Sequence, residues 1–208
     1  KTIDSTGDFY SQWGLPFPRN RGEHTVFANK DGFVFGASGG ATLFKTALFE
    51  DIGLFDEDLF AYYEDADISF RAQLAGWKVV YTSSAVAYHK QGATSSKIPG
   101  FTVYQTFKNL PIVYIKNVPA GLRVFIGSRF YIAYFLILGN AIAHGNGGPA
   151  LRGYFKHLTL WPRKLKERAE IQRRKRVKAE YIRSILWADL PPDQTGLRKL
   201  RQKLTGEK

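Results

Sequence analysis

The sequence predicts an α/β protein, with a short mixed sheet in its first half and mostly helix in its second. In residues 1–98, short aromatic and β-branched runs alternate with clusters of Gly, Pro, Asn and Asp, a pattern typical of short strands and loops. From residue 99 onward, longer apolar runs recur with helical spacing. Hydrophobic residues make up 44% of the 208-residue chain, which is enough for a packed core.

Local signals place the elements of the first half. The run FVFGASGG reads as a buried strand that ends in small residues, and the valines of WKVVYTS favour another strand. Gly53 and Gly76 are expected to stop two helices, the second of which has acidic residues in its first turn. The expected order is loop with short extended pieces (1–32), strand (33–40), helix (42–53), aromatic loop (55–63), helix (64–76), strand (77–83) and a further extended run (84–89).

The second half is expected to be helical. A helix over 101–117 is predicted to be interrupted at Pro111, because proline lacks the N–H that a helix interior needs. Apolar and amphipathic helices should follow, and then a long basic helix with Pro162 in its first turn. The predicted domains are a first part of short strands and helices (1–98), a helical, basic, membrane-associating extension (99–190) and a flexible tail (191–208).

Charge divides the chain in the same place. Residues 1–100 hold nine basic and twelve acidic side chains, whereas residues 101–208 hold 21 and six. A basic surface of this kind meets nucleic acid, anionic lipid or an acidic partner. The apolar run 130–143 is shorter than the roughly 20 residues that span a bilayer, so it is expected to lie in the membrane interface or in a core.

Composition excludes several classes. The chain has no cysteine, which excludes a disulfide-stapled secreted fold and any cysteine-based zinc site. The first residues, KTIDSTGDFY, lack the apolar run of a signal peptide, and the chain contains no methionine. The sequence is therefore expected to be a piece of a longer polypeptide or a processed product.

Acidic side chains gather between Asp56 and Asp67, beside many aromatic residues. Carboxylates in the first turn of a helix, here Glu64, Asp65 and Asp67, complement its free N–H groups, and capping is the simplest interpretation. A calcium loop is excluded, because the EF-hand order of acids with a central Gly and a closing Glu is absent. A catalytic base is the third interpretation, since aromatic walls and like-charged neighbours strengthen a carboxylate as a proton acceptor.

The run from Gly36 to Ser95 resembles the second half of a family 2 glycosyltransferase catalytic domain of the GT-A fold. The resemblance rests on five pieces in the right order and spacing: GASGG, G-x-F-D-E, Y-x-E-D-x-D-x-x-x-R, A-G-W with V-V-Y, and A-V-x-Y-H. It covers about 60 residues and is closest to the bacterial rhamnosyltransferase branch. It implies an inverting transfer from a nucleotide-diphosphate sugar to a hydroxyl of a polysaccharide or lipid-linked acceptor.

The resemblance also implies roles for particular residues. Asp65 matches the general base, with Glu64 beside it, and His89 matches a histidine that binds a divalent metal, Mg²⁺ or Mn²⁺, in related members. Asp65–Asp67 is not the D-x-D metal motif, because it lies in a predicted helix. The residues matched to substrate contacts are Gly36, Ala37, Ser38, Gly39, Gly40, Asp67 and Arg71.

The sequence departs from the family pattern, because the nucleotide-binding first half and its D-x-D strand are absent. The active-site roles are therefore expected to apply to the complete enzyme, or to a complex with a separate first half. The expected partners are the nucleotide-diphosphate sugar, the acceptor and an anionic membrane surface, at the cytoplasmic face of a bacterial inner membrane, with no nucleic acid. The alternatives are a non-catalytic fragment that binds membrane or a partner, and a nucleic-acid-binding module.

Overall fold

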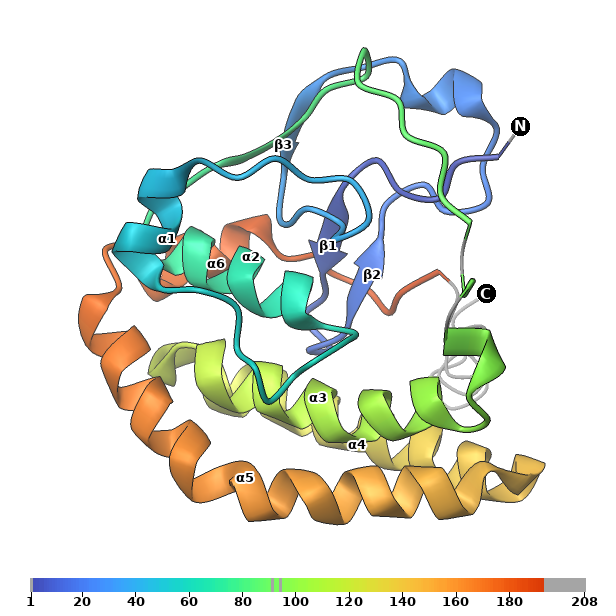
Figure 1. Cartoon of the computed structure of the whole chain (residues 1–208). Helices are drawn as coiled ribbons and strands as arrows, with labels where there is room; N and C mark the ends of the chain where they lie inside the picture. Colours follow the sequence, from blue (N-terminus) through green and yellow to red (C-terminus); the bar gives the residue numbers. More distant parts are fainter. Residues whose placement is uncertain (1, 91, 94, 193–208) are drawn as a thin grey trace, which may run out of the picture.

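The computed structural model describes residues 2–90, 92, 93 and 95–192, with short strands in the first half and long helices in the second (Figure 1). Strand β1 (Asp8–Tyr10) pairs with β2 (Pro16–Pro18), and β3 (Gly32–Val34) pairs with β4 (Val79–Tyr81). Both pairs are antiparallel, and an isolated bridge between Asp8 and Gly36 joins them. The predicted mixed sheet is therefore wrong for the described residues, whose paired strands are all antiparallel. After α1 and α2, the chain returns as β4, which runs beside β3 in the opposite direction.

The helices of the first half agree with the sequence pattern. Helix α1 (Thr46–Ile52) and helix α2 (Glu64–Leu74) lie where periodicity predicts them. Gly53 and Gly76 follow them with φ angles of +80° and +85°, and glycine adopts such positive φ values without steric cost. Short 3₁₀ turns, η1 (Thr25–Ala28) and η2 (Ser95–Lys97), complete this half, and the run 84–89 forms no regular strand.

Helix α3 (Phe101–Asn117) continues through Pro111, contrary to the predicted interruption. The proline removes the N–H that would bond the carbonyl of Phe107, four residues earlier. That carbonyl instead accepts a hydrogen bond of 2.8 Å from the hydroxyl of Tyr134. A side chain from another helix therefore compensates the missing donor.

The remaining elements are η3 (Ala120–Leu122), α4 (Arg123–Ala141), the π-type turn η4 (Ile142–Asn146), α5 (Gly147–Arg174) and α6 (Ala179–Ile185). Pro162 does not begin a helix but lies inside α5, which Figure 1 shows to be bent along its length. The predicted long basic helix is thus divided between the end of α5 and α6. Gly153 lets α5 lie close to α3, because a Cβ there would be only 2.4 Å from the carbonyl oxygen of Tyr104.

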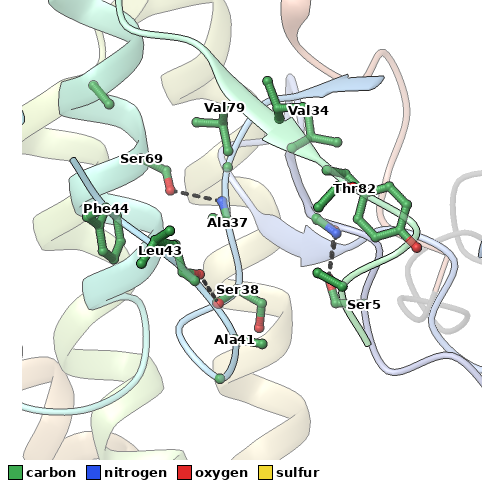
Figure 2. Close-up of a pocket in the computed structure, with 18 of the residues that line it drawn as sticks. Ser5, Val34, Ala37, Ser38, Ala41, Leu43, Phe44, Ser69, Val79 and Thr82 are labelled. Atoms are coloured by element: carbon green, nitrogen blue, oxygen red, sulfur yellow. Dashed lines mark hydrogen bonds between the residues drawn. The ribbon is translucent and has the colours of Figure 1, made fainter. Parts of the chain in front are cut away.

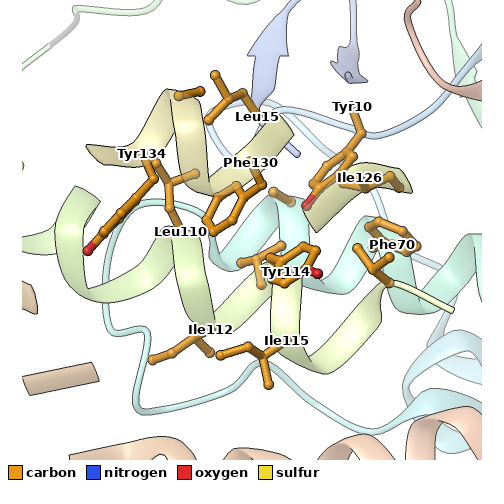
Figure 3. Packing of buried hydrophobic residues seen from close by; sticks show 14 of the residues in the cluster. Tyr10, Leu15, Phe70, Leu110, Ile112, Tyr114, Ile115, Ile126, Phe130 and Tyr134 are labelled. Carbon is orange, nitrogen blue, oxygen red and sulfur yellow. The ribbon is translucent and has the colours of Figure 1, made fainter. Parts of the chain in front are cut away.

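One hydrophobic core runs through both halves of the chain (Figure 3). Tyr10 packs edge-on against Phe70 at 4.9 Å between ring centroids, and Tyr114 stacks on Phe130 at 4.8 Å. The core therefore crosses the predicted boundary at residue 98, and the division into domains stays a prediction. Most of the predicted tail, 193–208, lies outside the described residues.

Candidate active site

The segment from Gly36 to Gly40 follows β3 and separates two cavities. The Asp65 cavity, about 1130 Å³, is lined by Asp8, Arg21, Ser38, Gly39, Gly40, the 60–66 loop and helix start, His89, Lys90 and the start of α3. The Ser69 cavity, about 740 Å³, is lined by Gly36, Ala37, Ser38, Gly40, Ser69, β4 and His89 (Figure 2). Three predicted site residues, Ser38, Gly40 and His89, therefore border both.

Asp65 stands in the first turn of α2 and is partly exposed to its cavity. Its Oδ2 accepts a hydrogen bond of 2.9 Å from the N–H of Gly39, and its Oδ1 accepts one of 2.8 Å from the N–H of Ala66. The second bond stabilises the helix start, as the capping interpretation requires. Both bonds also fix the direction of a carboxylate that keeps free lone pairs toward the open cavity.

Two adjacent glycines lie against Asp65 and His89. A Cβ placed on Gly39 would lie 3.4 Å from Asp65 Oδ2, and one on Gly40 would lie 3.4 Å from His89 Nδ1. A side chain at either position would therefore lie in contact with the carboxylate or the imidazole. Gly36 lies closer still to α2. A Cβ placed on it would be 2.9 Å from the side chain of Ser69, so the absence of a side chain lets this segment approach the helix.

Glu64 is half-buried beside Asp65. Burial, opposed in part by a backbone hydrogen bond and reinforced by the charge of Asp65, raises the pKa of the Glu64 carboxyl. Its Oε2 is buried and has no hydrogen-bond partner among the described residues. A buried unpaired acceptor is costly, so this oxygen is ready to accept a hydrogen bond from a bound hydroxyl.

Asp8 is a site residue that the sequence did not reveal. It lies on β1, lines the Asp65 cavity and accepts a hydrogen bond of 2.9 Å from the hydroxyl of Ser5. Burial and then the charge of Asp65 raise the pKa of Asp8 to about 7, against the lowering effect of Ser5. Its bridge to Gly36 is a long-range contact that helps to place it here, and a lone Asp after a turn gives no sequence signal of such pairing.

Replacing Asp8 with Asn is expected to change how stability depends on pH. The native state keeps the Asp8 proton up to a pKa of about 7, whereas the unfolded chain loses it near 3.8. The native state therefore binds more protons between these values, and its stability falls as the pH rises through them. We compare the free energy of unfolding of the asparagine variant with that of the parent. The difference, variant minus parent, should be about 2 kcal/mol larger at about pH 8 than at about pH 4.5. Urea unfolding at both pH values measures this, and an unchanged difference would contradict it.

Asp67 and Arg71, predicted to contact substrate, are placed elsewhere. Asp67 is fully buried and Arg71 nearly so, and neither lines the two cavities. Asp67 accepts hydrogen bonds from Arg71 Nε at 2.9 Å and Asn117 Nδ2 at 2.8 Å, and Lys116 Nζ lies 3.1 Å away. Arg71 also donates to the carbonyls of residues 52, 53 and 54 at the end of α1. These two residues join α1, α2 and α3.

One group of three carboxylates among the described residues, Asp56, Asp58 and Glu167, is close enough to hold a metal ion. However, Lys164 Nζ already lies 2.7–2.8 Å from all three side chains, and Lys116 Nζ also bonds Asp56. The ammonium groups supply the positive charge that a cation would bring. The group therefore fits an ion-pair network better than a metal site.

His89 presents a different donor set. Its Nδ1 lies 2.6 Å from Oδ2 of Asp4, which also pairs with Arg21 at 2.9 Å. An imidazole nitrogen and a carboxylate oxygen are both common ligands of divalent metals. These atoms fit part of a ligand set, and the remaining ligands would come from other groups. His89 borders both cavities, whereas Asp4 lines the Ser69 cavity.

The loop before α2 has a strained backbone. Phe60, Tyr62 and Tyr63 have φ angles of +59°, +66° and +71°. Bulky residues rarely adopt this left-handed conformation, which costs about 1–3 kcal/mol each, and such strain gathers at binding and catalytic sites. All three residues line the Asp65 cavity.

Comparison with known proteins matches residues 3–108, just over half of the chain, to the family described as "Glycosyltransferase like family 2". The match covers the strands, α1, α2 and every residue of the Asp65 cavity.

Among curated proteins, the chain is similar to the N-acetylglucosaminyl-diphospho-decaprenol L-rhamnosyltransferase of Mycobacterium tuberculosis, strains CDC 1551 / Oshkosh and ATCC 25618 / H37Rv. Identity to each is 37% over 62 residues, which is 30% of this chain and 20% of the relative. The matched part thus spans about a fifth of the relatives' length. No solved structure matches the chain significantly. The predicted resemblance is confirmed, and the chain belongs to the glycosyltransferase-like family 2.

Proposed function

We propose that this chain forms the acceptor-side part of an inverting glycosyltransferase, which moves a sugar from a nucleotide diphosphate to a hydroxyl of a glycan or lipid-linked acceptor. The observation that carries the proposal is the carboxylate of Asp65, oriented by the Gly39 N–H at 2.9 Å and open to a cavity of about 1130 Å³. Such a volume accommodates sugar-sized ligands. Membership of the family supports glycosyl transfer as the reaction.

In the proposed reaction, Asp65 accepts the proton of the acceptor hydroxyl while that oxygen bonds to the anomeric carbon of the donor. The bond from this carbon to the diphosphate oxygen breaks, and the nucleoside diphosphate leaves with the electron pair. Because attack and departure occur on opposite faces, the configuration inverts. The unpaired Oε2 of Glu64 can accept a hydrogen bond from a second hydroxyl of the sugar.

His89 and Asp4 are the residues of this chain that would hold a divalent metal, Mg²⁺ or Mn²⁺, together with ligands outside the chain. When bound, such an ion stabilises negative charge on a departing diphosphate. Arg21 and Lys90 line the Asp65 cavity, as His89 does, and add positive charge there. The cavity therefore has acidic groups where a hydroxyl must lose a proton and basic groups where phosphate charge must be stabilised.

Transfer can be tested with the full-length protein, a panel of nucleotide-diphosphate sugars and a short-chain N-acetylglucosaminyl-diphospho-prenol. This acceptor follows the name of the mycobacterial relative, and rhamnose donors belong in the panel for the same reason. Mass spectrometry should detect one added sugar, and NMR coupling constants should show inversion at its anomeric carbon. Retention of configuration, or no transfer from any donor, would contradict the proposal.

We also infer that helices α4 and α5 dock this protein on an anionic membrane surface at the cytoplasmic face. The stretch Ala120–Arg174 contains a window long and apolar enough to cross a membrane, yet only 39% of that window is buried. A core helix would be mostly buried, so the exposed apolar side chains favour contact with lipid. The docking face consists of Ile132, Phe135 and Leu136 of α4 and Leu151, Phe155 and Leu158 of α5.

Exposed basic residues of the same helix α5, Arg152, Lys156 and Lys166, would attract anionic headgroups, each by about 1 kcal/mol. Replacing Phe135 and Phe155 together with Asp is therefore expected to lower flotation with phosphatidylglycerol vesicles at least tenfold, because two rings are lost and two negative charges are added. Phe33→Asp is the matched control, since Phe33 is an exposed ring on β3. Equal flotation of both variants and the parent would argue against docking through this face.

A further inference from the structure

The strained loop before α2 has no role in the reaction proposed above, yet it forms one wall of the Asp65 cavity. Leu59, at its start, is fully buried and anchors it in the core. Phe60, the next residue, is turned outward and is 77% exposed. A left-handed backbone at Phe60 thus accompanies an aromatic ring held in water at the cavity mouth.

A buried amide on α3 holds this loop. Asn109, which is fully buried, directs its Nδ2 group at three loop carbonyls, those of Leu59, Ala61 and Tyr62, at 2.9, 2.9 and 2.7 Å. The preceding Lys108 adds a bond of 2.6 Å to the carbonyl of Asp58. Side-chain donors thus replace the hydrogen bonds that a regular backbone would make itself, and they keep the strained conformation in place.

The loop is also fixed from the cavity side. Tyr62 donates a hydrogen bond of 2.6 Å from its hydroxyl to Ser95, and it accepts one of 3.1 Å from Thr102. The ring of Phe60 meets that of Phe101 at right angles, with 6.4 Å between centroids. Phe60, Tyr62 and Phe101 therefore form an aromatic wall, and the same loop leads directly into the helix turn that carries Asp65.

We propose that Phe60 is the stacking platform for the acceptor sugar in the Asp65 cavity, and that Asn109 is the positioning residue that holds it there. This inference rests on the function proposed above and names how the acceptor is bound. A pyranose ring has an apolar C–H face and hydroxyls at its edge. The cavity offers a matching set, with an exposed aromatic face on one wall and the carboxylates of Glu64 and Asp65 on the neighbouring one.

Phe60→Ala should raise the KM for the acceptor about tenfold, with the KM for the donor and kcat changed less than about twofold, because stacking is lost while the base stays. Phe60→Trp should keep the parent value, since it retains an aromatic face. Phe27→Ala is the matched control, because Phe27 is 63% exposed but lines neither cavity. An acceptor KM that Phe60→Ala leaves unchanged would overturn the platform.

Asn109→Asp keeps the shape of the side chain but removes its donors. It should raise the acceptor KM and also lower kcat, because the loop positions Asp65 as well as Phe60. The double variant with Phe60→Ala should raise the acceptor KM by less than the product of the two single effects. The variant could instead show only a lower melting temperature, with KM and kcat unchanged when they are measured below it. That result would give Asn109 a purely structural role and overturn its assignment as the positioning residue.

Saturation-transfer NMR with N-acetylglucosamine separates this inference from the proposed reaction, because it needs no turnover. Transfer from aromatic protons to the sugar C–H face should be strong in the parent and in Phe60→Trp, and weak in Phe60→Ala. If the sugar binds in this way but no donor is used, the reaction fails and the platform stands. If the enzyme transfers sugar to the acceptor but the NMR experiment shows no aromatic contact, the platform fails and the proposed reaction stands.

Discussion

Asp65→Asn should reduce sugar transfer by a factor of about 10²–10⁴, the range expected when a general base is removed. The asparagine side chain cannot accept the proton of the acceptor hydroxyl. Its carbonyl oxygen can still accept one of the present backbone hydrogen bonds, from Gly39 or Ala66. The fold should therefore be retained, and the loss should appear in kcat rather than in the KM for the donor.

The measurement is initial rates of the full-length protein, with melting temperature recorded for each variant. Glu57→Gln is a suitable control, because Glu57 is an exposed acid eight residues earlier that lines neither cavity. It should leave both rate and melting temperature nearly unchanged. Turnover of Asp65→Asn within tenfold of the parent would defeat the assignment of Asp65 as the base.

Asp67→Ala should destabilise the fold by about 3–5 kcal/mol without any direct role in the reaction. Asp67 is fully buried, and its removal leaves the guanidinium of Arg71, which is 5% exposed, without its carboxylate partner. Lys116, which is 2% exposed, loses one of its carboxylates but keeps Asp56. A buried charge whose partner is removed costs far more than a surface ion pair contributes. Urea unfolding at neutral pH measures the loss, and a value below about 1 kcal/mol would contradict the prediction.

Glu170→Ala provides the contrast, because Glu170 pairs with Arg173 on an exposed surface, and its loss should leave the free energy of unfolding nearly unchanged. The pH dependence adds a second check. Burial opposes ionisation of Asp67, but Lys116, Arg71 and Asn117 outweigh it and hold its pKa below the usual 3.8. Its contribution is therefore present above pH 3.8 and is lost as the pH falls through the lower native value, so parent and variant should converge in acid.

Part of the candidate site could be predicted from sequence because its signals are local. Helical spacing and first-turn acids define α2, and glycines at 53 and 76 end the two helices, since each of these effects acts within a few residues. The spacing of the E-D pair and the A-V-x-Y-H run identified the family, which the family comparison confirms. The catalytic role of Asp65 stays a prediction.

Other residues could not be assigned without long-range contacts. Asp67 and Arg71 match the same motif as Asp65, but Lys116 on α3 draws them into a buried ion network instead of the cavity. Pro111 was expected to interrupt a helix, yet Tyr134 from α4 supplies the missing hydrogen bond.

The sequence by itself determined the family, the order of the helices and the place of Asp65 in the first turn of α2. The tertiary structure alone decided which side chains share a cavity with Asp65. Asp8 arrives through its bridge to Gly36, and Asn109 reaches the loop at 59–62 from a helix about 50 residues away. The physical reason is that propensity and capping act over one or two turns of chain, whereas burial and hydrogen-bond partners depend on which distant segments pack together.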